Sequence, residues 1–281
     1  MELSGKTAVI TGGASGIGLA TARQFAHSGL KLVLGDIEEG PLHEAVESLA
    51  AEGAHVIGVA CDVSQEEDVT RLRDRALAEF GSAHIVFNNA GVVGGPAIGP
   101  PKKVWDWVMG VNVDGVINGV NAFAPLFLEQ NEGHIVNTAS LAGLGGMPGT
   151  GAYSASKFAV VGISESLFQE FALSGANVGV SVLCPGFVNT RIYESERNMP
   201  NELVSFNEDP MMQMARQIGE TVVKAGIDPA DVAKAVDHAI RANQFWILPH
   251  ERVALRMTQL RLEWMQGGPP LFINLDAATK P

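Results

Sequence analysis

The 281-residue sequence predicts an α/β protein with a doubly wound parallel sheet and helices on both faces. Short runs rich in Val and Ile recur along the chain, and stretches with helical spacing of apolar residues separate them. The runs are continuously apolar rather than alternating, which is typical of strands buried on both faces. The alternation of strand and helix implies right-handed crossovers between parallel strands, so we expect a single domain over 1–281.

The expected strands share this Val- and Ile-rich character. In chain order they cover residues 7–11, 30–36, 55–62, 83–91, 133–140, 178–186 and 245–249. Helical periodicity is clearest in the segments GIGLATARQFAHSG and EEDVTRLRDRALAEFG. Ligands of such folds bind beyond the carboxyl ends of the strands, so the residues just after each run are the candidates for chemistry.

Composition limits the class of partner. The net charge is −12 and no cluster of Lys and Arg is present, which argues against nucleic acid and anionic membranes. Cys61 and Cys184 each lie beside an apolar run and are expected as buried free thiols. We expect no signal peptide, no membrane-spanning run and a soluble, cytoplasmic protein. The scattered histidines indicate no catalytic metal.

The segment TGGASGIG (11–18) follows the first strand and opens the first helix. Gly12, Gly16 and Gly18 permit a tight turn in which backbone N–H groups approach a ligand closely. A helix that begins near Ser15 would direct its positive dipole end at this turn, which suits a pyrophosphate. The spacing is G-x-x-x-G-x-G rather than the commoner G-x-G-x-x-G, and steric need for glycine in the turn is the alternative.

The second strand ends at Asp36, where an acidic side chain would accept hydrogen bonds from the ribose hydroxyls of a dinucleotide. A carboxylate there repels a 2′-phosphate. The neighbours Gly35, Ile37, Ala14 and Ser15 carry no positive charge, so the sequence predicts NAD(H) rather than NADP(H). A plain strand-end turn or helix cap is the alternative reading of Asp36.

Two further strand ends carry polar residues whose role stays open. Asp62 could accept a hydrogen bond from the adenine amino group or cap a helix that begins near Ser64. The segment NNAG (88–91) could let the backbone pass close under a cofactor, or it could simply mark a turn.

The segment GAYSASKFAV (151–160) places Tyr153 four residues before Lys157, so both side chains face the same space on a helix. A free phenol has a pKa of about 10. A nearby ammonium, joined by an oxidised nicotinamide, would lower that pKa and let the phenol exchange a proton with an alcohol. Ser140, at the end of the fifth strand, could hold the substrate oxygen. Such a pair is common by chance, but its combination with the glycine turn and Asp36 indicates hydride transfer.

Together these motifs resemble the classical branch of the short-chain dehydrogenase/reductase family. The resemblance runs through LSGKTAVITGGASGIG, DIEE, CDVS, NNAG, VNVDGV, IVNTASLAG, YSASK and CPGFVNT. It implies a seven-stranded Rossmann sheet in the order 3-2-1-4-5-6-7 and an NAD cofactor. It also implies a homotetramer, with a homodimer as the alternative, in which the helix around 102–130 and the helix of Tyr153 meet another subunit.

The resemblance assigns roles to single residues. Tyr153 would be the acid/base, Ser140 would orient the substrate oxygen, Lys157 would bind the nicotinamide ribose, and Asn112 would hold through its backbone a water linking Lys157 to solvent. The dinucleotide would contact Gly12, Ser15, Gly16, Ile17, Gly18, Asp36, Ile37, Asp62, Val63, Asn89, Ala90, Gly91, Tyr153, Lys157, Pro185, Gly186, Val188 and Thr190.

A largely apolar substrate pocket is expected, with Arg191 and Arg197 as possible exceptions. Its residues would be Ser140, Leu141, Ala142, Leu144, Met147, Tyr153, Phe187 and Tyr193, with the rest of the segment 192–214. Residues 187–227 are long for a connection and predict a substrate lid; a local helical pair with its own core is the alternative. The tail 267–281 is expected to pack across a partner subunit or to border the active site.

The sequence therefore predicts an NAD-dependent oxidoreductase that interconverts a secondary alcohol and a ketone. Two alternatives remain. A ketoacyl-type carbonyl reductase is disfavoured by Asp36, because reductive steps usually draw on NADPH. A non-catalytic NAD-binding sensor is disfavoured because Tyr153 and Lys157 are both present.

Overall fold

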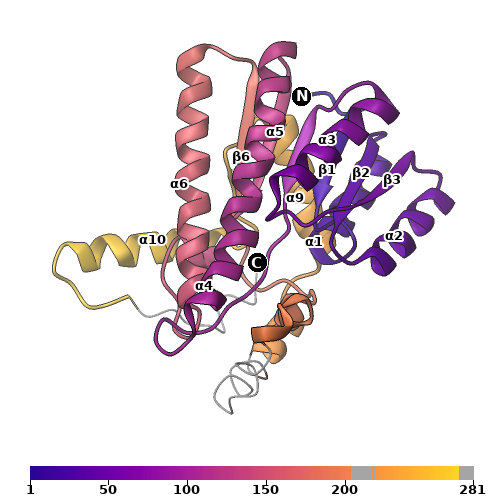
Figure 1. Ribbon diagram of the computed structural model, residues 1–281. Helices are drawn as coiled ribbons and strands as arrows, with labels where there is room; N and C mark the ends of the chain where they lie inside the picture. The colour runs from indigo at the N-terminus through magenta and orange to yellow at the C-terminus, as the bar shows by residue number, and fades with distance from the viewer. Residues whose placement is uncertain (204–216, 218, 272–281) are drawn as a thin grey trace.

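A seven-stranded sheet in the order β3-β2-β1-β4-β5-β6-β7 forms the centre of the computed structural model, which describes residues 1–203, 217 and 219–271 (Figure 1). Every strand pair is parallel, as predicted. The strands are β1 (Thr7–Thr11), β2 (Lys31–Asp36), β3 (Val56–Ala60), β4 (Ile85–Asn88), β5 (Gly133–Thr138), β6 (Val178–Leu183) and β7 (Trp246–Ile247). Several predicted runs extended past these ends, because the residues that follow β4, β5 and β6 leave the sheet as loops.

Helices cover both faces of the sheet. On one face lie α1 (Gly16–His27), α2 (Glu39–Ala51) and α9 (Pro229–Ala242); on the other lie α3 (Glu66–Phe80), α5 (Gly115–Gln130) and α6 (Gly151–Ser174). Further elements are α4 (Lys102–Met109), a π-helical turn η1 (Gly110–Asp114), the short 3₁₀ helices η2 (Leu141–Gly143), η3 (Ile192–Asn198) and η4 (Asn201–Leu203), and α10 (Glu251–Met265). Residues 219–224 are also helical.

Successive side chains of each strand enter different cores. In β1, Ala8 and Ile10 pack into the cluster under α1, α2 and α9, whereas Val9 packs into the cluster under α3, α5 and α6. The strand is buried along its whole length. This two-sided burial explains why the strand segments of the sequence are continuously apolar rather than alternating.

The helical stretch Lys102–Gln130 is long and apolar enough to cross a membrane by length and composition, which the sequence analysis did not expect. Half of its most apolar window is buried inside the protein, and α5 packs against α3, β4 and β5. Its apolar character is therefore that of a core helix. Ile117 and Leu128 of α5 are exposed, as are Phe168 and Leu173 of α6. These two helices are the ones expected to meet another subunit, and the oligomer stays a prediction.

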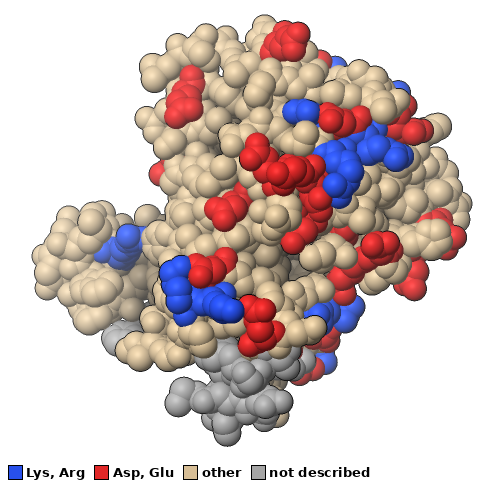
Figure 2. Space-filling view, viewed as in Figure 1, with Lys and Arg blue, Asp and Glu red and all other residues tan. Residues whose placement is uncertain are grey.

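The distribution of surface charge agrees with the expectation from the sequence. Figure 2 shows a face on which Lys and Arg side chains lie beside Asp and Glu side chains and form no continuous basic surface over the described residues.

Cys61 and Cys184 are buried free thiols, as predicted. Burial raises the pKa of each thiol to about 12, so neither is a ready nucleophile.

Candidate active site

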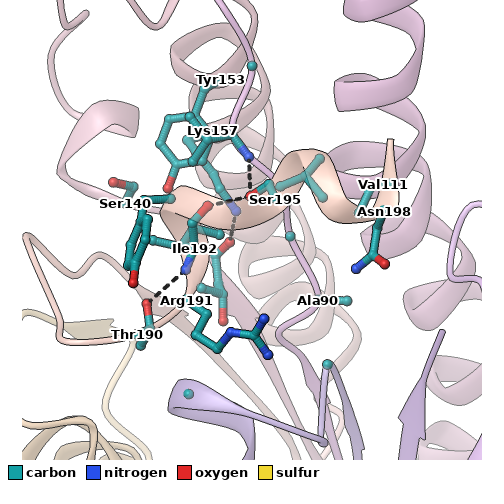
Figure 3. A pocket seen from close by; sticks show the side chains of 18 of the residues that line it. Ala90, Val111, Ser140, Tyr153, Lys157, Thr190, Arg191, Ile192, Ser195 and Asn198 are labelled. Atoms are coloured by element: carbon teal, nitrogen blue, oxygen red, sulfur yellow. Dashed lines mark hydrogen bonds between the residues drawn. The ribbon is translucent and has the colours of Figure 1, made fainter. Parts of the chain in front are cut away.

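A cleft of about 960 Å³ opens beyond the carboxyl ends of the strands. Each of the first six strands contributes to its wall through residues at its end or just after it: Gly12, Asp36, Asp62, Asn89, Ser140 and Pro185. This is the position at which open α/β sheets bind ligands. Figure 3 shows part of the wall, with Ser140, Tyr153 and Lys157 beside the segment Thr190–Ser195.

The glycine turn follows β1 and brings the backbone to the floor of the cleft. Gly12 and Gly16 have φ angles of 63° and 52°, which favour glycine over other residues. A Cβ at Gly12 would lie 2.9 Å from Cα of Ala90. Gly18 does not line the cleft: a Cβ there would clash with the carbonyl oxygen of Gly12, so this glycine allows the first turn of α1 to pack on the loop.

Asp36 is held in place by backbone donors at the end of β2. Its carboxylate accepts hydrogen bonds from Ala14 N at 3.0 Å and from Glu38 N at 3.1 Å. Burial raises the pKa of Asp36, and these two hydrogen bonds oppose that shift. The glycine turn and the β2 end are thus joined directly through this side chain.

Two other strand ends are also fixed by hydrogen bonds. Asp62 accepts from N and Oγ of Ser64 at 3.0 and 2.8 Å, while α3 begins only at Glu66, so Asp62 forms a local turn and lines the cleft as well. Asn89 Nδ2 donates to the carbonyl oxygens of Thr11 and Gly12 at 3.0 and 3.3 Å. Asn89 therefore ties the segment after β4 to the glycine turn.

Ser140, Tyr153 and Lys157 meet at one end of the cleft. A hydrogen bond between the side chains of Ser140 and Tyr153 lowers the pKa of the phenol, but burial outweighs it and the pKa of Tyr153 is raised. Nζ of Lys157 donates to the carbonyl oxygen of Thr138 at 2.8 Å, and burial lowers the pKa of Lys157 to about 8.

This pKa direction differs from the sequence-based expectation, in which the ammonium makes the phenol more acidic. The reason is that Lys157 is buried and Tyr153 is half-buried in the cleft wall, and desolvation favours the neutral form of each. The two residues do share a face of α6 as predicted, since Lys157 Nζ lies 5.5 Å from the centre of the Tyr153 ring.

Asn112 lies behind the cleft wall, fully buried in the π-helical turn η1. Its side-chain amide donates to Val92 O and Ser156 Oγ, both at 2.9 Å, and accepts from Val92 N at 2.8 Å. A Cβ at Gly91 would lie 3.3 Å from Asn112 Oδ1 and 3.5 Å from Lys157 Nζ. Asn112 and Lys157 therefore both lie next to Gly91, and the water-holding role of Asn112 stays a prediction.

Most expected site residues line the cleft. Those of the dinucleotide set are Gly12, Ser15, Gly16, Ile17, Asp36, Ile37, Asp62, Val63, Asn89, Ala90, Gly91, Tyr153, Lys157, Pro185, Gly186, Val188 and Thr190; those of the substrate set are Ser140, Leu141, Met147, Tyr153, Phe187 and Tyr193. Ala142 and Leu144 do not line it. Ala142 is fully buried in η2, and Leu144 packs against the apolar clusters that contain Leu141 and Val160.

Sequence reasoning missed the way η3 spans the cleft. Ser195 Oγ accepts a hydrogen bond from Val93 N at 3.1 Å, and Arg197 pairs with Glu38 at the opposite wall. Met199 and Leu203 pack on Val104, and Trp107 joins both this cluster and the cleft wall. The residues in each of these contacts are far apart in the chain, so no local sequence pattern predicts the contacts. Residues 204–216 and 218 of the expected lid, and 272–281 of the tail, lie outside the described residues.

The glycine turn, the half-buried carboxylate of Asp36 and the Ser140–Tyr153–Lys157 group lie in one cleft, in the chain order of a known family. A family model described as short chain dehydrogenase matches residues 6–201. The chain belongs to the classical short-chain dehydrogenase/reductase family. As a short-chain dehydrogenase it is an oxidoreductase, and the sheet order expected for that family is confirmed.

Individual relatives are similar over most of this short-chain dehydrogenase. A "CLA biosynthesis dehydrogenase/reductase" of Lactiplantibacillus plantarum is 32% identical over 256 residues, which cover 89% of each chain. The "3beta-hydroxysteroid dehydrogenase 2" of Eggerthella lenta is 39% identical over 205 residues, covering 70% of this chain and 78% of that one. The crystal structure of a short chain dehydrogenase/reductase from Burkholderia phymatum in complex with NAD has a TM-score of 0.93 and 42% identity, covering 98% and 99% of the two chains.

The cleft of this short-chain dehydrogenase fits a dinucleotide. Side chains at Gly12 and Gly16 would fill the cradle, because an added Cβ would lie 2.9 Å from Ala90 Cα in the first case and 3.0 Å from Thr190 Cγ2 in the second. Ser15 precedes α1 without making a side-chain cap hydrogen bond. An anionic pyrophosphate at this helix N-terminus and a ribose at Asp36 match the donors and acceptors present.

Proposed function

We propose that this short-chain dehydrogenase interconverts a secondary alcohol and a ketone with NAD(H) as the hydride carrier. The observation that carries the proposal is the grouping of Ser140, Tyr153 and Lys157 in the same cleft as Asp36. The NAD complex of the Burkholderia phymatum relative and the hydroxysteroid dehydrogenase from Eggerthella lenta support it.

The residues that would hold the dinucleotide follow from their chemistry. The backbone around Gly12 and Gly16 would bind the pyrophosphate, Asp36 would accept hydrogen bonds from the adenosine ribose, and Lys157 would donate to the nicotinamide ribose. The nicotinamide, when bound, supplies hydride transfer to or from the carbon that bears the substrate oxygen.

Ser140 and Tyr153 would handle the substrate oxygen. The hydroxyl of Ser140 accepts from Ala142 N at 3.1 Å. Its single proton can go to Pro185 O, over a long 3.4 Å, or to the hydroxyl of Tyr153, so it is easily redirected to a substrate oxygen. Tyr153 would take the hydroxyl proton in alcohol oxidation and return it in ketone reduction. Burial raises the pKa of Tyr153, and we expect the positive charges of Lys157 and of an oxidised nicotinamide to make the phenolate accessible.

The substrate end of the cleft favours a neutral, apolar molecule. Leu141, Met147, Phe187 and Trp107 line it. Of the expected exceptions, Arg191 pairs with Glu194 at 2.6 Å and Arg197 pairs with Glu38. A carboxylate substrate would therefore have to compete with an existing ion pair.

The test is a panel of neutral secondary alcohols, anionic hydroxy acids and ketones, assayed by the absorbance of the reduced nicotinamide with NAD⁺, NADP⁺ and their reduced forms. We expect turnover of bulky neutral alcohols with NAD⁺ and weak turnover with NADP⁺. A clear preference for hydroxy acids would contradict the substrate class. A clear preference for NADPH-linked reduction would favour the carbonyl-reductase alternative.

A further inference from the structure

A salt bridge joins the two walls of the cleft at the end where Asp36 lies. Arg197 Nε donates to both carboxylate oxygens of Glu38, at 3.1 and 3.0 Å, and its Nη2 donates to Oε2 at 2.7 Å. The pair connects η3 to the residue that precedes α2, and both residues line the cleft. The side chains are only 26% and 21% exposed, so solvent screens the interaction less than at an open surface.

The guanidinium of Arg197 is also held by its own segment. Its Nη1 donates to the carbonyl oxygens of Arg191 and Glu194 at 3.3 and 3.0 Å. The hydrogen bond from Arg197 holds the pKa of Glu38 below its usual range, so the carboxylate stays ionised at neutral pH. The positive charge of Arg197 is thus matched by a fixed negative charge.

The pair lies beside the carboxylate expected to contact the adenosine ribose. Glu38 N donates to Asp36 Oδ1 at 3.1 Å, and the negative charge of Asp36 contributes to raising the pKa of Arg197. Two carboxylates and one guanidinium therefore meet at the place where NAD and NADP differ by a phosphate. An arginine here has the planar donor geometry that binds phosphate with two hydrogen bonds.

The other cationic side chains of the described cleft wall, Lys157 and Arg191, lie away from Asp36 or are paired with another residue. Lys157 lies at the catalytic end, and Arg191 pairs with Glu194. Arg197 is therefore the cation best placed to receive a 2′-phosphate. Its guanidinium donors are already hydrogen-bonded to Glu38.

We propose that Glu38 is a second determinant of cofactor choice, acting by sequestering Arg197 from the 2′-phosphate of NADP(H). Asp36 excludes the phosphate by direct repulsion, whereas Glu38 removes the guanidinium that would attract it. This inference rests on the proposed function, because it requires a dinucleotide whose adenosine ribose lies at Asp36.

The test measures binding rather than turnover. Dissociation constants of NAD⁺ and NADP⁺ are determined by isothermal titration calorimetry for the wild type, Glu38→Gln, the double variant Glu38→Gln/Arg197→Gln and a control, Glu39→Gln. Glu39 is exposed and lies off the cleft wall, so its variant removes the same charge one residue away. Calorimetry needs no substrate, and NAD⁺ binding itself reports that each variant is folded.

Freeing Arg197 in Glu38→Gln should improve NADP⁺ binding relative to NAD⁺ by roughly tenfold or more, the value of a charge-assisted hydrogen bond. The gain should disappear in the double variant, and Glu39→Gln should keep the wild-type ratio. An unchanged ratio in Glu38→Gln would overturn the proposal, and so would a gain that persists without Arg197, because simple loss of negative charge would then explain it. If the wild type binds neither dinucleotide, or binds NADP⁺ as tightly as NAD⁺, it is the proposed function that fails.

Discussion

The ammonium of Lys157 lies 5.5 Å from the centre of the Tyr153 ring and donates a hydrogen bond to the carbonyl oxygen of Thr138 at 2.8 Å. Burial acts on both groups, raising the pKa of Tyr153 and lowering the pKa of Lys157 to about 8. We therefore expect ionisation of the phenol to depend on the positive charges near Tyr153. The first two predictions follow from this dependence.

Replacing Tyr153 by Phe should abolish proton transfer while leaving the fold and the dinucleotide cradle intact. We expect kcat to fall by about 10²–10⁴, the usual contribution of a general acid/base. The dissociation constant of NAD⁺, measured by calorimetry, should change little. Tyr193→Phe is a matched comparison, because Tyr193 also lines the cleft and is the other of the two tyrosines in the chain; as an expected substrate contact it should change KM more than kcat. Wild-type turnover in Tyr153→Phe would show that another group carries the proton.

Lys157→Met should move the pH profile of alcohol oxidation. Oxidation needs the deprotonated phenol, so its rate rises with pH. Removing the neighbouring ammonium raises the pKa of Tyr153 further, and the ascending limb of kcat should shift upward by about 1–3 pH units. Lys157→Arg keeps the positive charge and should leave the limb nearer its wild-type position. An ascending limb at the same pH in wild type and Lys157→Met would mean that the lysine does not tune the phenol.

Gly18→Ala should destabilise the protein, although Gly18 does not line the cleft. The new Cβ would press on the carbonyl oxygen of Gly12, and overpacking of this kind lowers the free energy of unfolding by about 1–3 kcal/mol. NAD⁺ binding should weaken as well, because the turn must shift. Gly162→Ala is the control: Gly162 is exposed inside α6 and its Cβ would meet nothing within 4 Å, so stability should stay equal or rise by up to about 1 kcal/mol. Denaturant unfolding of both variants measures the free energy of unfolding, and equal values for the two variants would contradict the prediction.

His250 should make stability depend on pH in the mildly acidic range. This fully buried residue accepts a hydrogen bond at Nδ1 from Gly186 N at 3.0 Å, and burial lowers its pKa. Between the lowered pKa and the unfolded value of about 6.5, the unfolded chain binds the proton and the folded chain does not. The free energy of unfolding should therefore fall as the pH drops below about 6.5.

In His250→Asn that part of the pH dependence should be lost, since the amide oxygen can still accept from Gly186 N but does not titrate. The comparison is the difference in unfolding free energy between each variant and the wild type across this pH range. His55→Asn, at an exposed position before β3, is the control for removing a histidine. Parallel curves for wild type and His250→Asn would contradict the prediction.

The sequence by itself determined the sheet and the residues that act through local geometry. Continuous apolar runs predict strands buried on both faces, and β1 is buried along its whole length. The strand order was implied by the family resemblance and is confirmed. The glycine turn, Asp36 at the end of β2, and Tyr153 and Lys157 on one helix were all predictable, because spacing along one element fixes their relative position.

The tertiary structure decided what depends on neighbours distant in the chain. It turned Ala142 and Leu144 away from the cleft, and it made Gly18 a packing residue rather than part of the cleft wall. It also brought Arg197 to Glu38, where the sequence neighbours of Asp36 had indicated no positive charge. Burial reversed the expected pKa direction of Tyr153 for the same reason: desolvation and ion pairing depend on what surrounds a group in space, and spacing along one chain does not specify those surroundings.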